Sequence, residues 1–572
     1  MQGDRRLASV GQWLAFAVVT VVLLLFLVIP MFSLFWVSFT GEPSNILRDL
    51  FRGDLAGFVR NLTEGASLHY YREFFTTPRY YMGLINGLLF SAMVTLGCCV
   101  LGVGLALAMA RTAVPFKGVL RALSVLPLAI PSYLMALSFI LIFGKTGLIT
   151  RGLALVGIPQ IDPFTPFACA MVQIFSFFPL VLLTTSAALE RMDPSLEEAS
   201  SVLGGPRDYT FSRVSIPMLL PGVAAGAFLT FIRSFGDFAT MKLLIPSSTR
   251  MIVVEAYRDM SGNTYWGGAA TLSTVMVAVI LIGLGLQKYV IERNRFETLT
   301  GKGIAQPRLM QNPAACWAIF AVCVILLGFP VLNLGIIALL SVASNWTTTA
   351  LPSSYTLANY QRALFDKPES IVNGFILSGI ALVLALAFAG GVAYMIHRTK
   401  FWGRHVLDFV TLFPFIIPGT AFAIALVTTF NEPPLALHLT VYIVVIAYVI
   451  TRTPYGVRSI LASFQQIGPA MEESSKTLGA TGTVTLWKVL LPLIRPGIIA
   501  GGIMIFISTM TDVAITIMVC PPAWYPASLH VFNQVADSHY SSAAAYGIVL
   551  MALIYIPYII MLKIVGVRDM SL

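Results

Sequence analysis

Long apolar runs recur along the chain and constrain its fold more than any other feature. A helix needs about 20 mostly apolar residues to cross the hydrocarbon core of a bilayer. The tenth run is the weakest, because its core at 441–450 has to borrow flanking residues. We expect an all-α polytopic membrane protein with about twelve transmembrane helices. The runs lie near 13–39, 83–110, 122–143, 166–189, 218–245, 269–287, 314–342, 371–397, 406–430, 439–450, 497–519 and 543–562.

The composition excludes most other classes of protein. Of the 572 residues, 57% are hydrophobic and 11% are charged, whereas soluble chains carry about 25% charged residues. A soluble enzyme, a disordered chain and a nucleic-acid-binding domain are therefore excluded, and the lipid bilayer is the expected environment. The net charge of +10 does not indicate nucleic acid, since the basic residues lie in short loops between apolar runs.

The basic residues also predict the orientation. With the N-terminus inside, the inside segments hold 23 Lys and Arg, the outside segments hold 11, and Arg233 and Lys242 lie within a run. Cytoplasmic loops carry an excess of Lys and Arg. We therefore expect both termini in the cytoplasm and the chain in a bacterial inner membrane.

The chain contains one unit twice. Each unit has six runs, an even number, so both sit the same way up as a parallel repeat. We expect a first permease-like unit at 1–291, a cytoplasmic linker at 292–313 and a second unit at 314–572. The matched positions include Asn86-Gly87 with Asn373-Gly374, Arg111-Thr112 with Arg398-Thr399, Pro217 with Pro492, and Asp237 with Asp512.

Two matching inside loops, 193–217 and 468–492, are longer than a compact bundle needs. In each loop a short helix is predicted, with two acidic residues in its first turn, where the helix dipole favours them. A glycine then ends it, because glycine accepts the left-handed conformation. A single such loop is compatible with a hairpin that only stabilises the bundle. Two copies favour a docking surface for a groove in a partner protein.

The residues of these loops resemble a family motif. The first loop has Glu198-Ala199-Ser200, Gly204 and Val214-Ser215-Ile216-Pro217, and the second has Glu473-Ser474-Ser475, Gly479 and Val489-Leu490-Leu491-Pro492. The order and spacing resemble the Glu-Ala-Ala (EAA) motif of the membrane subunits of ABC importers that use a soluble binding protein. Serine replaces alanine and valine replaces isoleucine, which keeps similar sizes. The resemblance covers nearly the whole chain and implies a type I ABC importer permease fold.

The resemblance implies a transport subunit that is not itself an enzyme. Each loop would be a coupling helix in a cleft of a cytoplasmic ATPase, so two loops imply two copies of that subunit, with a periplasmic substrate-binding protein on the other side. ATP-Mg would bind to the ATPases and no cofactor to this chain, which lacks the phosphate-binding pattern GxxxxGK[ST]. The glutamates would bond to the ATPase. The coupling residues implied are Glu197, Glu198, Ala199, Gly204, Glu472, Glu473, Ser474 and Gly479.

Two acidic residues within the runs occupy matched positions of the repeat. Asp237 and Asp512 lie about 20 residues after matched prolines, or about 30 Å along a continuous helix. Acids inside a membrane indicate function by default, so the pair could line the entrance to a substrate path. The alternative is that each is solvated or caps a helix end. Arg233 is placed to pair with Asp237, whereas Ser508 in the second unit leaves Asp512 without such a partner.

The cargo follows only from the resemblance. The fused double layout most resembles ferric-iron importers, and thiamine and aminophosphonate importers share it. No metal ligands are identified, since the six histidines are scattered and no CxxC pair occurs. A twelve-helix secondary carrier is the more distant alternative. It would have charges for ion coupling at mid-membrane and no use for the two long loops.

Overall fold

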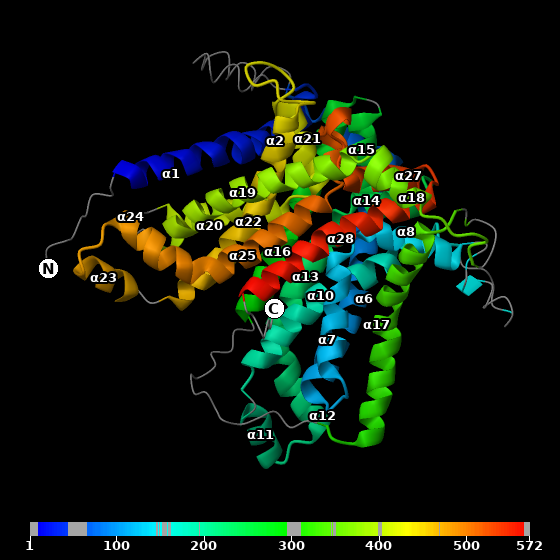
Figure 1. The fold of residues 1–572 in the computed structure, drawn as a ribbon, viewed down its shortest axis with the longest axis vertical. Coiled ribbons are helices and arrows are strands. Elements are labelled where there is room, and N and C mark those ends of the chain that lie inside the picture. The colour runs from blue at the N-terminus through cyan, green and yellow to red at the C-terminus, as the bar shows by residue number, and fades with distance from the viewer. Residues whose placement is uncertain are drawn as a thin grey trace.

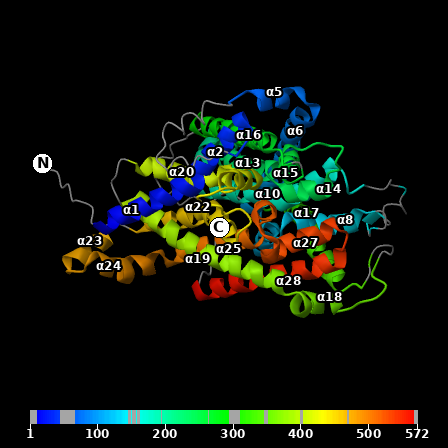
Figure 2. The same cartoon turned by 90° about the horizontal axis from the view of Figure 1, so that it is seen from above.

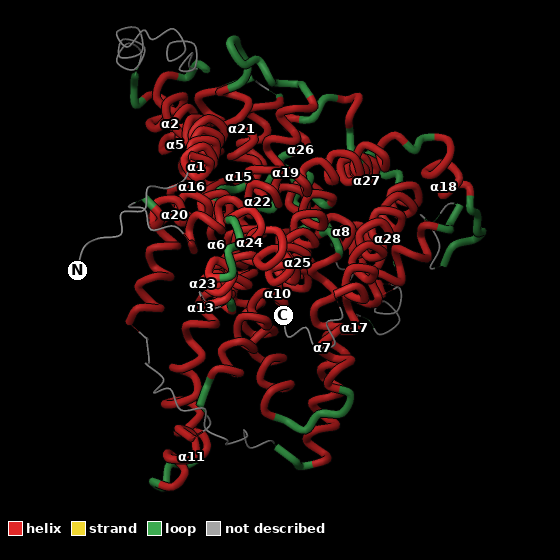
Figure 3. Tube along the Cα trace, turned by 60° about the vertical axis from the view of Figure 1, so that its left-hand side comes forward, coloured by secondary structure: helices red, strands yellow, loops and turns green. Residues whose placement is uncertain are grey.

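The fold is helical throughout the part of the chain that the structure describes. The computed structural model describes residues 10–43, 66–144, 147, 149–150, 157, 162–193, 195–262, 264–293, 310–344, 346, 351–398, 403–467 and 470–565. Among these residues there is no strand, only two isolated β-bridges, Thr112 with Met310 and Ala343 with Tyr355 (Figures 1 and 3). The all-α prediction is confirmed.

Each half contains long helices joined by short ones. The first half comprises α1 Val10–Leu23, α2 Ile29–Thr40, α5 His69–Thr76, α6 Pro78–Arg111, α7 Lys117–Val125, α8 Ser132–Phe143, α10 Pro166–Arg191, α11 Ser195–Val202, α12 Arg207–Thr210, α13 Ile216–Phe235, α14 Phe238–Leu244, α15 Ile252–Ser261 and α16 Trp266–Arg293. The second half comprises α17 Pro313–Ser341, α18 Ala358–Gln361, α19 Glu369–Arg398, α20 Arg404–Ile416, α21 Gly419–Thr429, α22 Val441–Gln466, α23 Ala470–Thr477, α24 Gly482–Thr485, α25 Leu491–Met510, α26 Thr516–Val519, α27 Ala527–Ala536 and α28 Tyr540–Val565.

Short π-helical and 3-10 turns join several of these helices. They are η1 Leu24–Val28, η2 Leu126–Ala129, η3 Phe211–Ser215, η4 Arg362–Asp366, η5 Leu486–Leu490 and η6 Pro522–Trp524.

The helices confirm a multi-pass membrane protein. Within the described residues, nine are long and apolar enough to cross a membrane, and two sharply bent pairs raise the number to eleven if each counts as one span. The bent pairs are α7 with α8 and α20 with α21, at 101° and 107°. The expected run at 439–450 belongs to neither group. It corresponds to α22, a 26-residue helix that carries two arginines.

Four of the expected runs are broken rather than continuous helices. The bent pairs break just before or at Pro131 and Pro418, because proline lacks an N–H and disfavours helix in the preceding residue. The run at 218–245 was expected to be one helix, which is wrong: α13 ends at Phe235, and Asp237 caps the separate helix α14. The run at 497–519 breaks in the same way, between α25 and α26.

Each half is built on three closely packed helices. In the first half α6, α10 and α13 pack on one another, and in the second half α19, α22 and α25 do so. Small residues permit this close approach, as is usual between membrane helices. A Cβ added to Gly102 of α6 would lie 2.8 Å from the Cβ of Val181 in α10. An alanine there would force the two helices apart.

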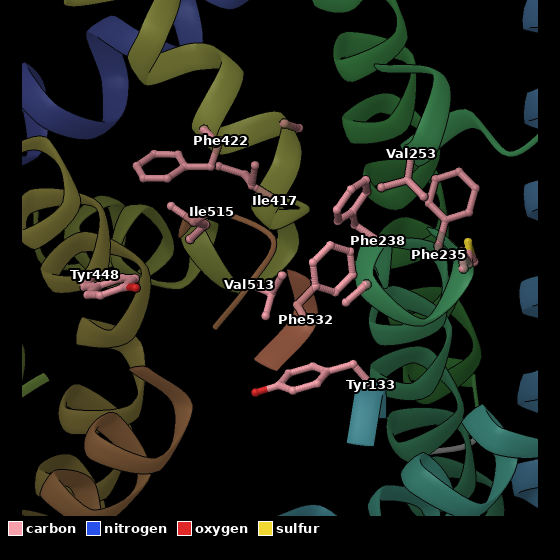
Figure 4. Close-up of a cluster of buried hydrophobic side chains, with 14 of the residues drawn as sticks. Tyr133, Phe235, Phe238, Val253, Ile417, Phe422, Tyr448, Val513, Ile515 and Phe532 are labelled. Atoms are coloured by element: carbon pink, nitrogen blue, oxygen red, sulfur yellow. The ribbon is translucent and has the colours of Figure 1, made fainter. Parts of the chain in front are cut away.

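Some helices of each half pack against helices of the other half. Helix α2 packs on α21 of the second half, and α17 packs on α8 of the first. Helix α1 lies along α19 (Figures 1 and 2). Between the halves is an apolar core, in which the Phe238 and Phe532 rings lie 6.0 Å apart (Figure 4). The two halves therefore form one body.

Most of the expected linker 292–313 lies outside the described residues. Met310, near its end, is held to the end of α6: its N–H donates to the carbonyl of Arg111 at 2.9 Å, and its carbonyl accepts from Ala113 at 2.9 Å. The start of the second half is thereby fixed to the first.

Candidate functional site: the two matched loops

The first loop folds as the sequence predicts. Helix α11 follows Asp193, whose carboxylate accepts from the N–H of Ser195 at 2.9 Å, and this bond lowers the pKa of Asp193 below its usual value. Gly204 has φ +82°. The N–H of Gly205 donates to the carbonyl of Ser200 at 2.9 Å, which completes a Schellman-type helix end. Pro194 lies outside the described residues.

The second loop repeats this geometry. Helix α23 ends at Gly479, which has φ +81°, and the N–H of Ala480 donates to the carbonyl of Ser475 at 3.1 Å. The hydroxyl of Ser475 bonds that of Thr485 at 2.9 Å. Ser200 and Thr210 make the matching bond in the first loop at 2.7 Å. The repeat therefore extends to individual hydrogen bonds.

An ion pair ties the first loop to its bundle. Arg111, the last residue of α6, donates from Nη1 to Oε2 of Glu197 at 2.9 Å and from Nη2 to Oε1 at 3.0 Å. Ser215 adds a third bond to Oε1 at 2.6 Å. Both side chains of the pair are about three-quarters or more buried. Such two-pronged bonds fix direction as well as distance, so Glu197 holds α11 against the bundle.

The second loop has the equivalent pair. Nε of Arg398, the last residue of α19, lies 2.7 Å from Oε1 of Glu472, and both side chains are largely buried. Nη2 of Arg398 also donates to the carbonyl of Ile467 at 3.3 Å. Leu490 replaces Ser215 at the matching position, so the second pair lacks the additional hydroxyl. We expected the glutamates of both loops to bond to an ATPase. The sequence did not predict that Glu197 and Glu472 pair with arginines of the bundle.

The other glutamates and the ends of the short helices point outward. Glu198, Ala199, Glu473 and Ser474 are exposed. Leu203 and Leu478, the residues just before the two glycines, are 88% and 87% exposed. An acidic residue beside an exposed leucine, displayed twice in one geometry, is a surface suited to a partner protein.

The two loops lie at the far ends of the two bundles. Figure 1 shows α11 at the tip of the helices of the first half and α23 at the tip of those of the second, with the bundles diverging from their common core. Figure 3 shows α11 again well below α23. A change of the angle between the halves would therefore change the separation of these two helices.

Asp237 is placed as a helix cap. Its carboxylate accepts from the N–H of Thr240 at 3.3 Å and from the side-chain amide of Gln173 at 3.0 Å. Gln173 is itself fixed by the hydroxyl of Ser234 at 2.6 Å. Arg233, the expected partner of Asp237, instead donates to the hydroxyl of Tyr455 in the other half, at 2.7 Å.

Asp512 also caps a helix. In addition, it has a basic partner that the sequence did not predict. Its Oδ1 accepts from the N–H groups of Ile515 and Thr516 at 3.0 and 3.2 Å, and it forms an ion pair with Arg452 of α22. The expectation that Asp512 lacks neutralisation is wrong, because the partner comes from another helix rather than from one turn earlier. A substrate role for the two aspartates stays a prediction.

A charged network lies on the opposite side of the first half, between α6 and α15. Glu255 is 1% exposed and pairs with Arg79, Arg250 and Arg258. Arg79 also pairs with Asp259, whose pKa is raised by burial. The matching positions of α27 hold no acidic residue. This side of the molecule is therefore not symmetric between the halves.

The described residues contain no group of three or more His, Cys, Asp or Glu that could hold a metal ion. The six cysteines are free thiols, five of them buried. Neither the loops nor the aspartates therefore form a metal centre within this part of the chain.

Duplicated helical bundles, each ending in the same outward loop, define a polytopic membrane protein of the transport-subunit class. The chain belongs to the family of binding-protein-dependent transport system inner membrane components, whose model matches residues 101–296 and 381–566. The family model matches twice, once in each half, as a fused double permease requires.

The chain is similar to transport permeases of several bacteria, some over both halves and some over a part of the chain. The ferric transport system permease protein FbpB of Actinobacillus pleuropneumoniae is 27% identical over 82% of this chain and 69% of its own. The probable ABC transporter permease protein y4fN of Sinorhizobium fredii is 27% identical over 93% of this chain and 90% of its own. The molybdenum transport system permease protein ModB of Mycobacterium bovis is 31% identical over 37% of this chain and 80% of its own.

Among solved structures, a bacterial ABC transporter involved in the import of the acidic polysaccharide alginate matches with a TM-score of 0.38 and 19% identity. The match covers 50% of this chain and 97% of that one.

Proposed function

We propose that this chain is the membrane subunit of an ATP-driven importer and that α11 and α23 are its coupling helices. The observation that carries the proposal is the duplication of one geometry: a short helix, a left-handed glycine, an exposed glutamate and an exposed leucine, pinned by an Arg–Glu pair. A loop that only stabilised its bundle would have no need to expose Leu203 and Leu478, because burying apolar surface is what stabilises.

Each coupling helix would enter a cleft on one of two identical ATPase subunits in the cytoplasm, which bind ATP-Mg. Glu198 and Glu473 would face the ATPases, whereas Glu197 and Glu472 hold the helices in place. Closure of the ATPases would bring α11 and α23 together and reopen the bundles on the other side. Both termini would then be cytoplasmic.

The opposite side would receive a periplasmic substrate-binding protein. The asymmetric network around Glu255 lies there and supports a partner that engages the two halves differently. For the cargo we propose ferric iron, since two-half relatives are named as ferric permeases. Other relatives are named for molybdenum, sulfate and 2-aminoethylphosphonate transport, so these are the alternative cargoes.

Reconstitution tests the proposal. Proteoliposomes holding this chain, its ATPase and its binding protein should accumulate labelled ferric iron only when ATP is supplied on the loop side. A double variant in which both Glu198 and Glu473 become Lys should abolish uptake and leave membrane insertion unchanged. Uptake that persists in this variant, or that runs on an ion gradient without ATP, would refute the proposal.

A further inference from the structure

A charged side chain lies beside the apolar core that separates the two sides of the molecule. Phe238 and Phe532 meet between the halves, with Tyr133 nearby (Figure 4). Arg233 lies five residues before Phe238, close to the end of α13. Helix α13 belongs to the candidate span Asp208–Phe235. The arginine therefore lies within a membrane-spanning segment, next to the point where the halves close.

Arg233 faces the boundary between the halves and not the lipid. Its Nη2 donates to the hydroxyl of Tyr455, which belongs to α22 of the other half, at 2.7 Å. The Tyr455 ring in turn packs edge-on against Phe415, with centroids 4.7 Å apart. Despite this contact the Arg233 side chain is exposed. Charged side chains within spans that face the interior of a bundle often mark substrate paths.

The nearby carboxylates are already engaged. Asp237 accepts from Thr240 and Gln173, and Asp512 pairs with Arg452 and caps α26. Within the described residues no carboxylate lies within 4.0 Å of the nitrogens of Arg233. Arg233 therefore makes no ion pair with these carboxylates, and its hydrogen bond goes to a phenol.

The charge is present in one half only. The position in the second half that matches Arg233 is Ser508, and the position in the first half that matches Tyr455 is Leu180. The Arg233–Tyr455 contact therefore has no counterpart at the matching positions of the repeat. The partner of Arg233 is a phenol and not a carboxylate. A ligand can therefore bind beside this phenol or displace it, and no buried carboxylate loses its partner.

We infer that Arg233 and Tyr455 form an anion-binding point on the translocation path, so the species that crosses carries oxygen-bearing negative charge. A guanidinium binds such groups through its planar fork, and the phenol adds one more donor. The inference rests on the proposed importer function and narrows its cargo. Iron would cross as an anionic chelate rather than as a bare cation, and a free oxyanion such as molybdate has the same chemistry.

Direct binding measurements test this inference. The purified chain with its ATPase, in lipid nanodiscs, is titrated with molybdate, sulfate, inorganic phosphate and ferric citrate, with chloride at matched ionic strength as the baseline. Thermal unfolding is the readout. We expect at least one of these anions to raise the midpoint saturably. The responding probe distinguishes a free oxyanion from a chelated metal.

Matched variants assign the effect to this point. Arg233→Gln should weaken the apparent affinity at least tenfold, Arg233→Lys should retain part of it, and Tyr455→Phe should weaken it less. Arg458→Gln is the control, because Arg458 lies on the same helix as Tyr455 but pairs with Asp408. Wild-type affinity in Arg233→Gln would overturn the inference. So would the absence of any saturable anion effect, or stabilisation by unchelated gallium(III) alone.

The same preparations separate this inference from the proposed function. If the ATPase co-purifies with Arg233→Gln and with the wild type, but no anion binds to the wild type, only the anion-binding point is refuted. If the ATPase fails to associate with the wild-type chain, the importer function itself fails.

Discussion

Arg111 and Glu197 are joined by two parallel hydrogen bonds, Nη1 to Oε2 at 2.9 Å and Nη2 to Oε1 at 3.0 Å. This pair connects the end of a 34-residue helix, α6, to the short helix α11. A rotation of α6 would therefore displace the loop. The pair assigns different tasks to two adjacent glutamates, one facing the bundle and one facing outward.

Removing the arginine should weaken coupling. In Arg111→Gln the largely buried Glu197 loses two charged bonds, at a cost of about 1–3 kcal/mol, or about 5–150-fold in the population of the docked loop. Substrate-stimulated ATP hydrolysis by the reconstituted complex should fall, with basal hydrolysis less affected. The exchange Arg111→Glu with Glu197→Arg should recover part of the stimulation. Full stimulation in the single variant would show that the pair is not needed.

The left-handed glycine should be sensitive to any side chain. Gly204→Ala places a Cβ at φ +82°, which costs about 1–2 kcal/mol, although there is open space around the site. We expect lower transport at normal membrane abundance. Gly482→Ala is the matched control, because Gly482 also has open space but no positive φ. Equal effects of the two changes would rule out the backbone explanation.

The exposed leucines should contribute to ATPase binding. Changing both Leu203 and Leu478 to Asp removes two apolar side chains that are nearly fully exposed and adds charge to the docking surface. We expect the ATPase to be lost from the purified complex. Leu357→Asp, at a position 70% exposed on the other side, should leave the complex intact. Unchanged ATPase retention in the double variant would contradict the docking role.

Two loops in one chain should set the composition of the complex. Because each half supplies one coupling helix, we expect one copy of this chain for two ATPase subunits. Native mass spectrometry of the detergent-purified complex measures the ratio. A ratio of two to two would mean that half of the loops have no partner.

The orientation can be measured by thiol labelling. Val202→Cys should react with a membrane-impermeant maleimide only in inverted vesicles, and Leu357→Cys only in intact spheroplasts. Both positions are exposed, and five of the six native cysteines are buried, which keeps the background low. Labelling of Val202→Cys from the outside would reverse the proposed topology.

The sequence predicts the spans and the loops well because both depend on local signals. Apolar runs identify spans without any knowledge of packing. Glycine at Gly204 and Gly479 marks a helix end through its own backbone freedom, and both have positive φ as expected. The matched prolines of the repeat were also visible in the sequence, although their effect at Pro131 and Pro418 was to break helices that were expected to be continuous.

What the sequence did not predict depends on contacts between distant helices. Asp512 pairs with Arg452, 60 residues away, whereas the expectation considered only the preceding turn. Arg111 and Arg398 occupy matched positions of the repeat, but the sequence pattern alone indicates no role for them. Since an arginine at a helix end and a glutamate in the loop recur at matched positions in both halves, the repeat itself carried the signal that could have found these pairs.

Arg233 and Ser508 occupy matched positions of the two halves and differ in charge. If the permease were instead assembled from two identical subunits, an arginine at position 233 would be present in both copies. Here a serine, Ser508, occupies the equivalent position. Because both copies are joined in one chain, the two positions can differ, and a permease of this kind can place a charge in one half and leave the matching position neutral.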